Sequence, residues 1–368
     1  MQSRRKDAGT VTRMGSSTPA PLWEAEVIFG LEEFAEDELR QRLGKSARLL
    51  GRTAPGRVAF GYVGADERLG ELRSVVAVHR VETFRVPRPK ALLGHEHLMR
   101  LLAMIHGILA RRSPGSFQTF RLSAAGSDSA VFQRLKTEIA RHTGLQLQES
   151  EADLQLAVRP APLGAGWQVL ARRTPRPQSA RQWRVRNMPG ALDATVAHVM
   201  VTLAHPRPEE RLLNLACGSG SLLVERLQLD RAAQAVGVDN DPQALACARD
   251  NLLAAERLRD AQLIRADAAQ LPLASASFDT IVVDLPWGLL VGSRRENERL
   301  YPALLSEAAR VAVPGATMVA ITASHVLFEE ALARCGERWH SERIVALQVP
   351  WERGYLRPRL YHLHRTAD

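Results

Sequence analysis

The sequence predicts an α/β protein whose C-terminal half is a Rossmann-like, doubly wound parallel sheet. From Arg211 onward, short β-forming segments alternate with helical segments, as such a sheet requires. Residues 281–283 are continuously apolar, which is typical of a parallel strand covered on both faces. Residues 218–220, Gly-Ser-Gly, lie between a predicted strand and a predicted helix. Since open α/β sheets bind ligands beyond the carboxyl ends of their strands, we expect the functional site at that edge.

The composition is that of a globular protein of two or three domains. The 368 residues are 45% hydrophobic and 24% charged, and no apolar run reaches membrane-spanning length, so no membrane partner is expected. Cys217, Cys247 and Cys335 are too far apart for a disulfide framework or a zinc finger. That spacing favours a cytoplasmic protein without a metal site. Residues 1–20 are polar and lack a following hydrophobic segment. They are expected to form a disordered tail, or to be an over-extended start with Met14 as the true initiator.

The charge of the chain favours a polyanionic partner. The formal net charge is +9, and no acidic residue occurs between Asp153 and Asp193. Arginines and two tryptophans are interleaved there, a pattern typical of nucleic-acid-binding surfaces. Arginine enrichment can also reflect genome base composition. The arginines that we select as candidate RNA contacts are Arg172, Arg173, Arg176, Arg181 and Arg184.

Two smaller units are predicted ahead of the parallel sheet. The first has strands at residues 23–28, 58–60 and 74–86 and helices at residues 31–43 and 95–111. The second has strands at residues 117–122, 154–158 and 167–171. Its helix is expected to be capped by Ser127 and Asp128 and to end at His142. A linker rich in proline and arginine covers residues 174–189, and residues 187–192 are expected to open a helix that ends at Leu203.

The parallel sheet follows. Its predicted strands are residues 212–216, 235–239, 262–265, 280–285, 317–322, 344–349 and 359–363, and its helices are residues 221–227, 242–255, 301–311 and 326–335. The glycine loop after the first strand exposes backbone amides at a helix N-terminus, where a carboxylate or phosphate is stabilised. Leu223 stands where a dinucleotide fold would have a third glycine, which disfavours a nicotinamide-dependent oxidoreductase.

Two acidic positions follow the next two strands. Asp239 lies roughly 20 residues beyond the glycine loop, where an acid binds the ribose hydroxyls of a nucleoside cofactor. The alternative role of Asp239 is to cap the helix that begins at Pro242, a role that Asn240 or Asp241 could also fill. Asp267 and Ala268 follow the third strand and are placed to meet an adenine edge.

The segment Asp284-Leu285-Pro286-Trp287 ends the fourth strand of the sheet. Asp284 would lie at the strand end, Pro286 stiffens the turn, and Trp287 offers a flat face on which a base could stack. The alternative is an ordinary strand exit with a buried tryptophan. A cytosine-C5 methylation would need a cysteine nucleophile, and none of the three cysteines lies near this segment in the sequence.

These motifs, in this order, resemble those of class I S-adenosylmethionine-dependent methyltransferases that act on exocyclic amines. With the N-terminal units, and with Leu300-Tyr301-Pro302 after the Asp284 segment, the whole chain resembles the THUMP-domain tRNA guanine-N2 methyltransferases. The resemblance implies a ferredoxin-like domain at residues 21–112, a THUMP RNA-binding domain at 113–175, a linker at 176–190 and a methyltransferase domain at 191–368. It also implies a monomer that methylates a tRNA guanosine, in the best-known members at position six of the acceptor stem.

The resemblance also implies roles for individual residues. Catalysis is expected from Asp284, Leu285, Pro286 and Trp287, and cofactor binding from Asn214, Ala216, Cys217, Gly218, Ser219, Gly220, Asp239, Asn240, Asp267, Ala268 and Asp284. Asp284 and the Leu285 carbonyl would orient the amine while Trp287 stacks on the base. Asn214 departs from the aspartate that is usual in the family, so cofactor affinity is expected to be lower. Leu285 replaces a proline that contributes mainly its carbonyl oxygen.

Two alternatives to a tRNA methyltransferase remain. A ribosomal-RNA guanine-N2 methyltransferase shares the same motifs. A catalytically impaired RNA-binding homologue is suggested by Asn214, although the intact Asp239, Asp267 and Asp284 favour an enzyme.

Overall fold

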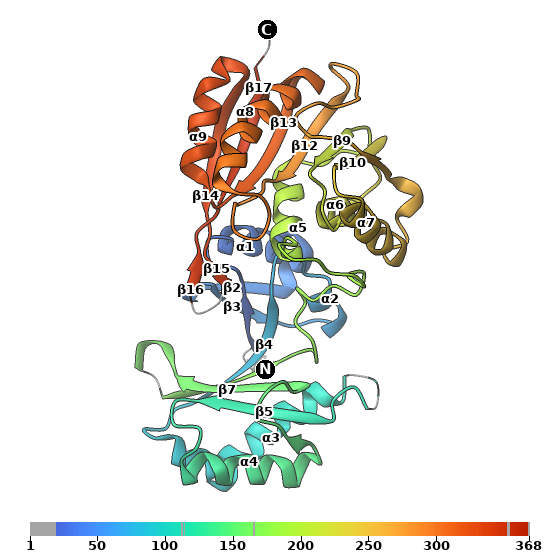
Figure 1. Ribbon diagram of the computed structural model, residues 1–368. Coiled ribbons are helices and arrows are strands. Elements are labelled where there is room, and N and C mark those ends of the chain that lie inside the picture. The colour runs from blue at the N-terminus through green and yellow to red at the C-terminus, as the bar shows by residue number, and fades with distance from the viewer. Residues whose placement is uncertain (1–19, 112, 114, 165, 352–353, 367–368) are drawn as a thin grey trace, which may run out of the picture.

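Two large sheets and a short hairpin organise the chain. The computed structural model describes residues 20–366 except 112, 114, 165, 352 and 353, so the tail expected at residues 1–20 lies almost entirely outside the described residues. Figure 1 shows the C-terminal sheet with its helices at the top, β1 to β3 with α1 in the middle, and β5 and β7 with α3 and α4 at the bottom.

The first sheet joins the two predicted N-terminal units. Its strands are β1 (Leu22–Glu26), β2 (Ala47–Ala54), β3 (Arg57–Tyr62), β4 (Ala77–Phe84), β5 (Thr119–Ala124), β6 (Gln146–Leu147), β7 (Leu154–Pro160) and β8 (Trp167–Arg172). They run in the order β2-β3-β1-β4-β8-β7-β5-β6. β4 pairs antiparallel with β1 and with β8, so a single long strand links the two units.

The helices on this sheet divide between its two halves. They are α1 (Glu32–Leu43), α2 (Asp66–Gly70), α3 (His95–Leu109) and α4 (Ala130–Thr143). Apolar residues of α3, such as Leu101, pack in one buried cluster with Leu135 of α4 and Phe120 of β5. The sequence places α3 in the first unit, with a boundary at residue 113. The boundary stays a prediction, but α3 belongs by its packing to the second half of the sheet.

The second sheet has the doubly wound architecture predicted. Its strands are β9 (Arg211–Leu215), β10 (Gln234–Asp239), β11 (Gln262–Arg265), β12 (Phe278–Asp284), β13 (Ala312–Thr322), β14 (Trp339–Ala346) and β17 (Arg359–Arg365), in the order β11-β10-β9-β12-β13-β17-β14. The pairs from β11 to β13 are parallel, and β17 is antiparallel to both neighbours. A hairpin of β15 (Val349–Trp351) and β16 (Gly354–Leu356) separates β14 from β17.

Helices cover both faces of the second sheet. They are α5 (Ala194–Leu203), α6 (Ser221–Leu229), α7 (Pro242–Ala254), α8 (Arg294–Val311) and α9 (His325–Arg334). Successive strand residues point to opposite faces. Thus Leu212 and Val282 pack with α5 and α6, while Leu213 and Val283 pack with α8 and α9. Among the described residues, no helix is long and apolar enough to cross a membrane.

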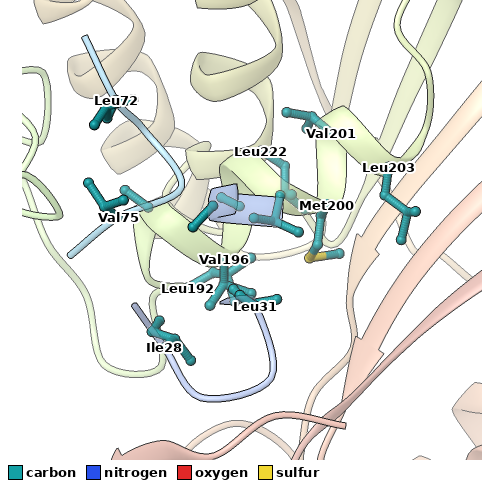
Figure 2. Packing of buried hydrophobic residues seen from close by; sticks show 14 of the residues in the cluster. Ile28, Leu31, Leu72, Val75, Leu192, Val196, Met200, Val201, Leu203 and Leu222 are labelled. Carbon is teal, nitrogen blue, oxygen red and sulfur yellow. The ribbon is translucent and has the colours of Figure 1, made fainter. Parts of the chain in front are cut away.

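Buried apolar side chains of α5 join the two sheets through a common hydrophobic core. Figure 2 shows Leu192, Val196 and Met200 packed beside Leu31, which precedes α1. Val75, which precedes β4, lies nearby. All these side chains are buried in one cluster with Leu222 of α6. The first half of the N-terminal sheet is therefore packed against the C-terminal domain as part of one hydrophobic core.

Several local predictions are wrong. Residues 187–192 are not helical: α5 begins at Ala194, because the Asp193 side chain accepts hydrogen bonds from the amides of Thr195 and Val196 at 2.7 and 3.3 Å. The N-cap of α4 is Ser129, not Ser127 or Asp128. The sequence analysis also missed β2 and the β15–β16 hairpin, whose short or polar segments lack a clear strand pattern.

Candidate functional site

A cavity of about 1130 Å³ lies at the carboxyl edge of the second sheet. The loops after β9, β10, β11 and β12 contribute most of the predicted site residues to its lining. These are Ala216, Cys217, Gly218, Ser219, Asp239, Asn240, Asp267, Ala268, Asp284, Leu285, Pro286 and Trp287. Parallel strands bring their carboxyl ends to one edge, so residues from four separate loops meet there. The sequence thus predicted the location of the cavity correctly.

The glycine loop is held by β10. The Cys217 amide donates to the Val238 carbonyl at 2.9 Å, and the Gly218 amide donates to Asp239 Oδ2 at 2.9 Å. Gly220 has φ +76 and begins α6, and a Cβ there would lie 3.0 Å from the Cβ of Ala248. Gly220 therefore shapes the loop from outside the cavity lining. Cys217 is buried, and burial raises the pKa of its thiol.

Asp239 does not cap α7. That cap is Asp241, whose side chain accepts from the Gln243 amide at 2.8 Å. Asp239 instead accepts from Gly218 and from the Asp241 amide, the latter at 3.0 Å, and it lines the cavity. The structure thereby removes the capping alternative and leaves Asp239 as an oriented carboxylate beside the glycine loop.

Asn214 lies in the sheet rather than in the cavity. It is fully buried, and its Nδ2 donates to the carbonyls of Leu215 and Val282 at 3.2 and 3.1 Å. It is not part of the cavity lining, and its Oδ1 has no hydrogen-bond partner among the described residues, so its contact with the cofactor stays a prediction. An aspartate at this position could not donate to those carbonyls, which explains an amide here.

Asp284 and Trp287 form a pair at the end of β12. Trp287 Nε1 donates to Asp284 Oδ1 at 3.1 Å. Burial raises the pKa of Asp284 to about 7, although the hydrogen bond from Trp287 acts in the opposite direction. Asp284 lines the cavity together with Trp287. A carboxyl group with a pKa near neutrality can accept a proton during a reaction and release it afterwards.

The loop around Pro286 is fixed by residues that the sequence analysis missed. The Pro286 carbonyl accepts from Asn297 Nδ2 at 2.7 Å and from the Tyr301 hydroxyl at 2.6 Å, and the Trp287 carbonyl accepts from Ser324 Oγ at 3.0 Å. Asn297 is fully buried and lines the cavity, and its Oδ1 has no partner among the described residues. Only the polar character of Asn297 in an apolar helix face signals this role.

Part of the cavity lining is apolar. It includes Leu289, Leu290 and Val291, which are about half exposed, and Trp351 of the β15–β16 hairpin. The sequence analysis missed both segments. The apolar run Leu289-Leu290-Val291 in the loop after Trp287 is the signal that could have revealed this segment. Consecutive apolar residues that are exposed to solvent are typical of a binding surface.

The candidate RNA-binding arginines are mostly bonded within the protein. Arg173 is 3% exposed and pairs with Asp66 Oδ2 at 2.8 Å, so the prediction that it contacts RNA is wrong. The Arg181 side chain is 8% exposed and bonds Glu225 at 3.0 Å, which excludes it for the same reason. Arg184 donates to the Leu192 carbonyl at 2.6 Å, and Arg172 to the Thr174 carbonyl at 2.8 Å. Only Arg176 among the five is exposed.

Glu225 of α6 explains why Arg181 turns inward. It is fully buried and accepts from Arg73 at 2.9 Å, from Arg181 at 3.0 Å and from Trp183 Nε1 at 3.3 Å, with His198 Nδ1 also at 3.3 Å. Burial raises its pKa, but the His198 hydrogen bond and the two arginine charges dominate and lower it to about 2. One carboxylate thus connects the N-terminal sheet, the linker, α5 and α6.

Comparison with known proteins places the C-terminal domain in a family. Residues 181–352 match UPF0020, the RMKL-like methyltransferase domain. The tRNA (guanine(6)-N(2))-methyltransferase THUMP3 of Mus musculus is 32% identical over 192 residues, which cover 49% of this chain and 37% of that protein. The chain therefore matches little more than a third of that relative. The tRNA (guanine(6)-N2)-methyltransferase of Thermus thermophilus is 28% identical over 357 residues, 94% of this chain and 100% of that protein.

Two solved structures share the fold along nearly the whole chain. TrmN from Thermus thermophilus has a TM-score of 0.71 at 23% identity, and covers 94% of this chain and 99% of its own. SMU.472, a putative methyltransferase complexed with SAH, has a TM-score of 0.67 at 16% identity, and covers 95% of this chain and 100% of its own. Both matches extend over the N-terminal sheet as well as the parallel sheet.

Proposed function

From the match of residues 181–352 to the RMKL-like methyltransferase domain and from the geometry of the cavity, we propose that the chain methylates the exocyclic N2 amine of a guanosine in tRNA. The observation on which this proposal rests is the paired Asp284 and Trp287 beside the glycine loop, in one cavity. The relatives named above act on guanine 6 of tRNA by their names. We propose the same nucleotide here, and a monomer acting in the cytoplasm.

The residues of the cavity fit S-adenosylmethionine. The amides at the start of α6 suit the carboxylate of its methionine part, because a helix N-terminus favours an anion. Asp239, already oriented by the Gly218 amide, offers carboxylate oxygens for two ribose hydroxyls. Asp267 and Ala268 lie in the same lining, where an adenine would be bound. When bound, the cofactor supplies an electrophilic methyl group on a sulfonium centre.

Asp284 is proposed to prepare the amine of the substrate. The guanine amine is a weak nucleophile because its lone pair is delocalised into the ring. A hydrogen bond from this amine to the free Oδ2 side of the Asp284 carboxylate would orient the nitrogen, while Trp287 keeps Oδ1 occupied. Methylation leaves a proton to be removed from the nitrogen, and the raised pKa of Asp284 suits it to accept that proton.

The loop around Pro286 and the apolar part of the cavity lining are proposed to position the base. Asn297 and Tyr301 fix the Pro286 carbonyl, so the backbone on either side of it keeps one conformation. Trp287 is held by its bond to Asp284 and offers its ring face to an extruded base. Trp351 and the Leu289–Val291 segment face the same cavity and would exclude water from the base.

The test is single-turnover methyl transfer to unmodified tRNA transcripts, with the product nucleotide mapped by mass spectrometry. We expect N2-methylguanosine in tRNA. We also expect Asp284→Ala to lower the rate by about 10²–10⁴-fold while calorimetry shows retained cofactor binding. Methylation of ribosomal RNA instead of tRNA would overturn the substrate assignment, and an unchanged rate in Asp284→Ala would overturn the catalytic role.

The pH dependence gives a second check. Since the pKa of Asp284 is raised to about 7, the carboxylate that accepts the proton is depleted as pH falls below 7. The single-turnover rate of the parent should therefore rise with pH and level off above about pH 8. Asp284→Asn should be slower and should lack this rise. A parent rate that is flat between pH 6 and 8 would contradict the assignment.

A further inference from the structure

A cluster of histidines lies away from the cavity, on the β14–β17 pair of the second sheet. His362 and His364 occupy alternate positions on β17, so their side chains share one face. Glu342 lies at an irregularity in β14, between Ser341 and Arg343, where the register with β17 shifts. Glu342 Oε2 is 2.9 Å from His362 Nδ1 and 2.7 Å from His364 Nε2. These three ligand atoms all lie within 4.8 Å of one another.

The cluster contains more histidine side chains than an ion pair with one carboxylate requires. A third ring, of His205, lies with its centroid 6.0 Å from that of His362. His362 is 4% exposed, and Nδ1 is the ring nitrogen that it presents to Glu342. Imidazole nitrogens are common ligands of transition-metal ions, and two of them meet one carboxylate oxygen here.

We propose that Glu342, His362 and His364 form a binding site for a divalent transition-metal ion, with Zn²⁺ the preferred ion. Two imidazoles and one carboxylate are a ligand set that Zn²⁺ accepts, with water in the fourth position. Bonds of about 2.0–2.2 Å place tetrahedral ligand atoms about 3.3 Å apart, so Glu342 has to withdraw by about half an ångström. Its side chain is 55% exposed and free to do so. That exposure also leaves an entry path for the ion.

The ion would join the two strands from which the β15–β16 hairpin extends. β14 precedes the hairpin and β17 follows it, and Trp351 of the hairpin lines the cavity. The site is separate from Asp239 and Asp284, and no step of methyl transfer involves it. Its expected effect is therefore on the stability of the sheet edge, because an ion that binds the folded chain shifts the folding equilibrium toward it.

The test is calorimetric titration of the metal-stripped, untagged full-length chain with ZnCl₂. We expect one ion per chain and a higher melting temperature with zinc. His364→Ala and Glu342→Gln remove exposed ligands and should each weaken zinc binding by at least about tenfold while circular dichroism stays unchanged. Bound Co²⁺ should show the visible spectrum of tetrahedral coordination in the parent and lose it in both variants.

His79→Ala is the matched control. His79 Nε2 lies 3.0 Å from Glu26 Oε2, a histidine–glutamate pair without a second imidazole, so this variant should bind zinc like the parent. Absence of saturable binding tighter than about 1 mM would overturn the proposal. So would zinc binding that persists unchanged in His364→Ala and Glu342→Gln, since the ion would then sit elsewhere, for instance at Cys335.

Discussion

The two halves of the N-terminal sheet are stabilised in different ways. β1 to β3 and α1 share a core with α5 of the methyltransferase domain and are tied to it through Glu225. β5, β7 and β8 enclose a separate core with α3 and α4. The half with β1 to β3 thus shares its hydrophobic core with the domain that forms the cavity. The half with β5, β7 and β8 is attached to that domain through β4 and the linker. The contrast separates residues that maintain the cavity from the half that contains the RNA-binding domain implied by the sequence resemblance.

The largest effect is expected from removing the whole N-terminal sheet. A fragment of residues 187–368 would expose Val196 and Met200 on α5, which lie in one buried cluster with Leu31 and Val75 of the removed segment. We expect it to aggregate and to show no cooperative melting, because an unpartnered apolar face of this kind is an aggregation liability. Cooperative melting with cofactor binding would show that the shared core is dispensable.

Breaking the Glu225 network should be the next most damaging change. Glu225→Gln leaves the Arg73 and Arg181 charges without their buried counterion and should cost about 3–5 kcal/mol of unfolding free energy. Glu298→Gln, which removes an exposed pair with Arg294, is the control and should cost less than about 1 kcal/mol. Urea unfolding at pH 7 measures both values. Equal costs would contradict a structural role for Glu225.

The same network has a pH signature. The folded-state pKa of Glu225 is lowered from 4.5 to about 2, so its contribution to stability is present above pH 4.5 and is lost as pH falls toward 2. The difference in unfolding free energy between the parent and Glu225→Gln should therefore shrink as pH is lowered through this range. A difference that is constant with pH would show that the carboxylate charge is not the source of the effect.

Two buried leucines test the comparison between the halves directly. Leu31 and Leu135 are both fully buried, the first in the shared core and the second in the separate core of α3 and α4. Each change to alanine should cost about 2–5 kcal/mol. Leu31→Ala should also weaken cofactor binding, whereas Leu135→Ala should weaken tRNA binding and leave cofactor affinity unchanged. Identical binding profiles for the two variants would refute the division.

The smallest effect is expected from single arginines of the linker. Exposed Arg176 can reach a phosphate, so Arg176→Ala should reduce the slope of log affinity against log salt by about 0.7–0.9 if it makes one contact. Arg173→Ala should leave the slope unchanged and lower the melting temperature, because Arg173 pairs with buried Asp66. tRNA-binding titrations at several salt concentrations separate the two. The reverse pattern would restore Arg173 as an RNA contact.

The sequence by itself determined the four parallel strands β9 to β12 and the loops that follow them. Continuous apolar runs such as residues 281–283, and the glycine loop at 218–220, are local patterns with local physical causes. Since parallel strands end at one edge, those patterns also predicted that Asp239, Asp267 and Asp284 line a common cavity.

Only the tertiary structure decided what distant side chains contact. Arg173 and Arg181 looked like RNA contacts because no acid is near them in the sequence, yet Asp66 and Glu225 neutralise them from other elements. The β4–β8 pairing that merges the two N-terminal units, and the strand pairing that brings Glu342 to the histidines of β17, likewise join segments with no local signal. Local pattern specifies the period and face of an element, whereas its partners depend on how the chain packs as a whole.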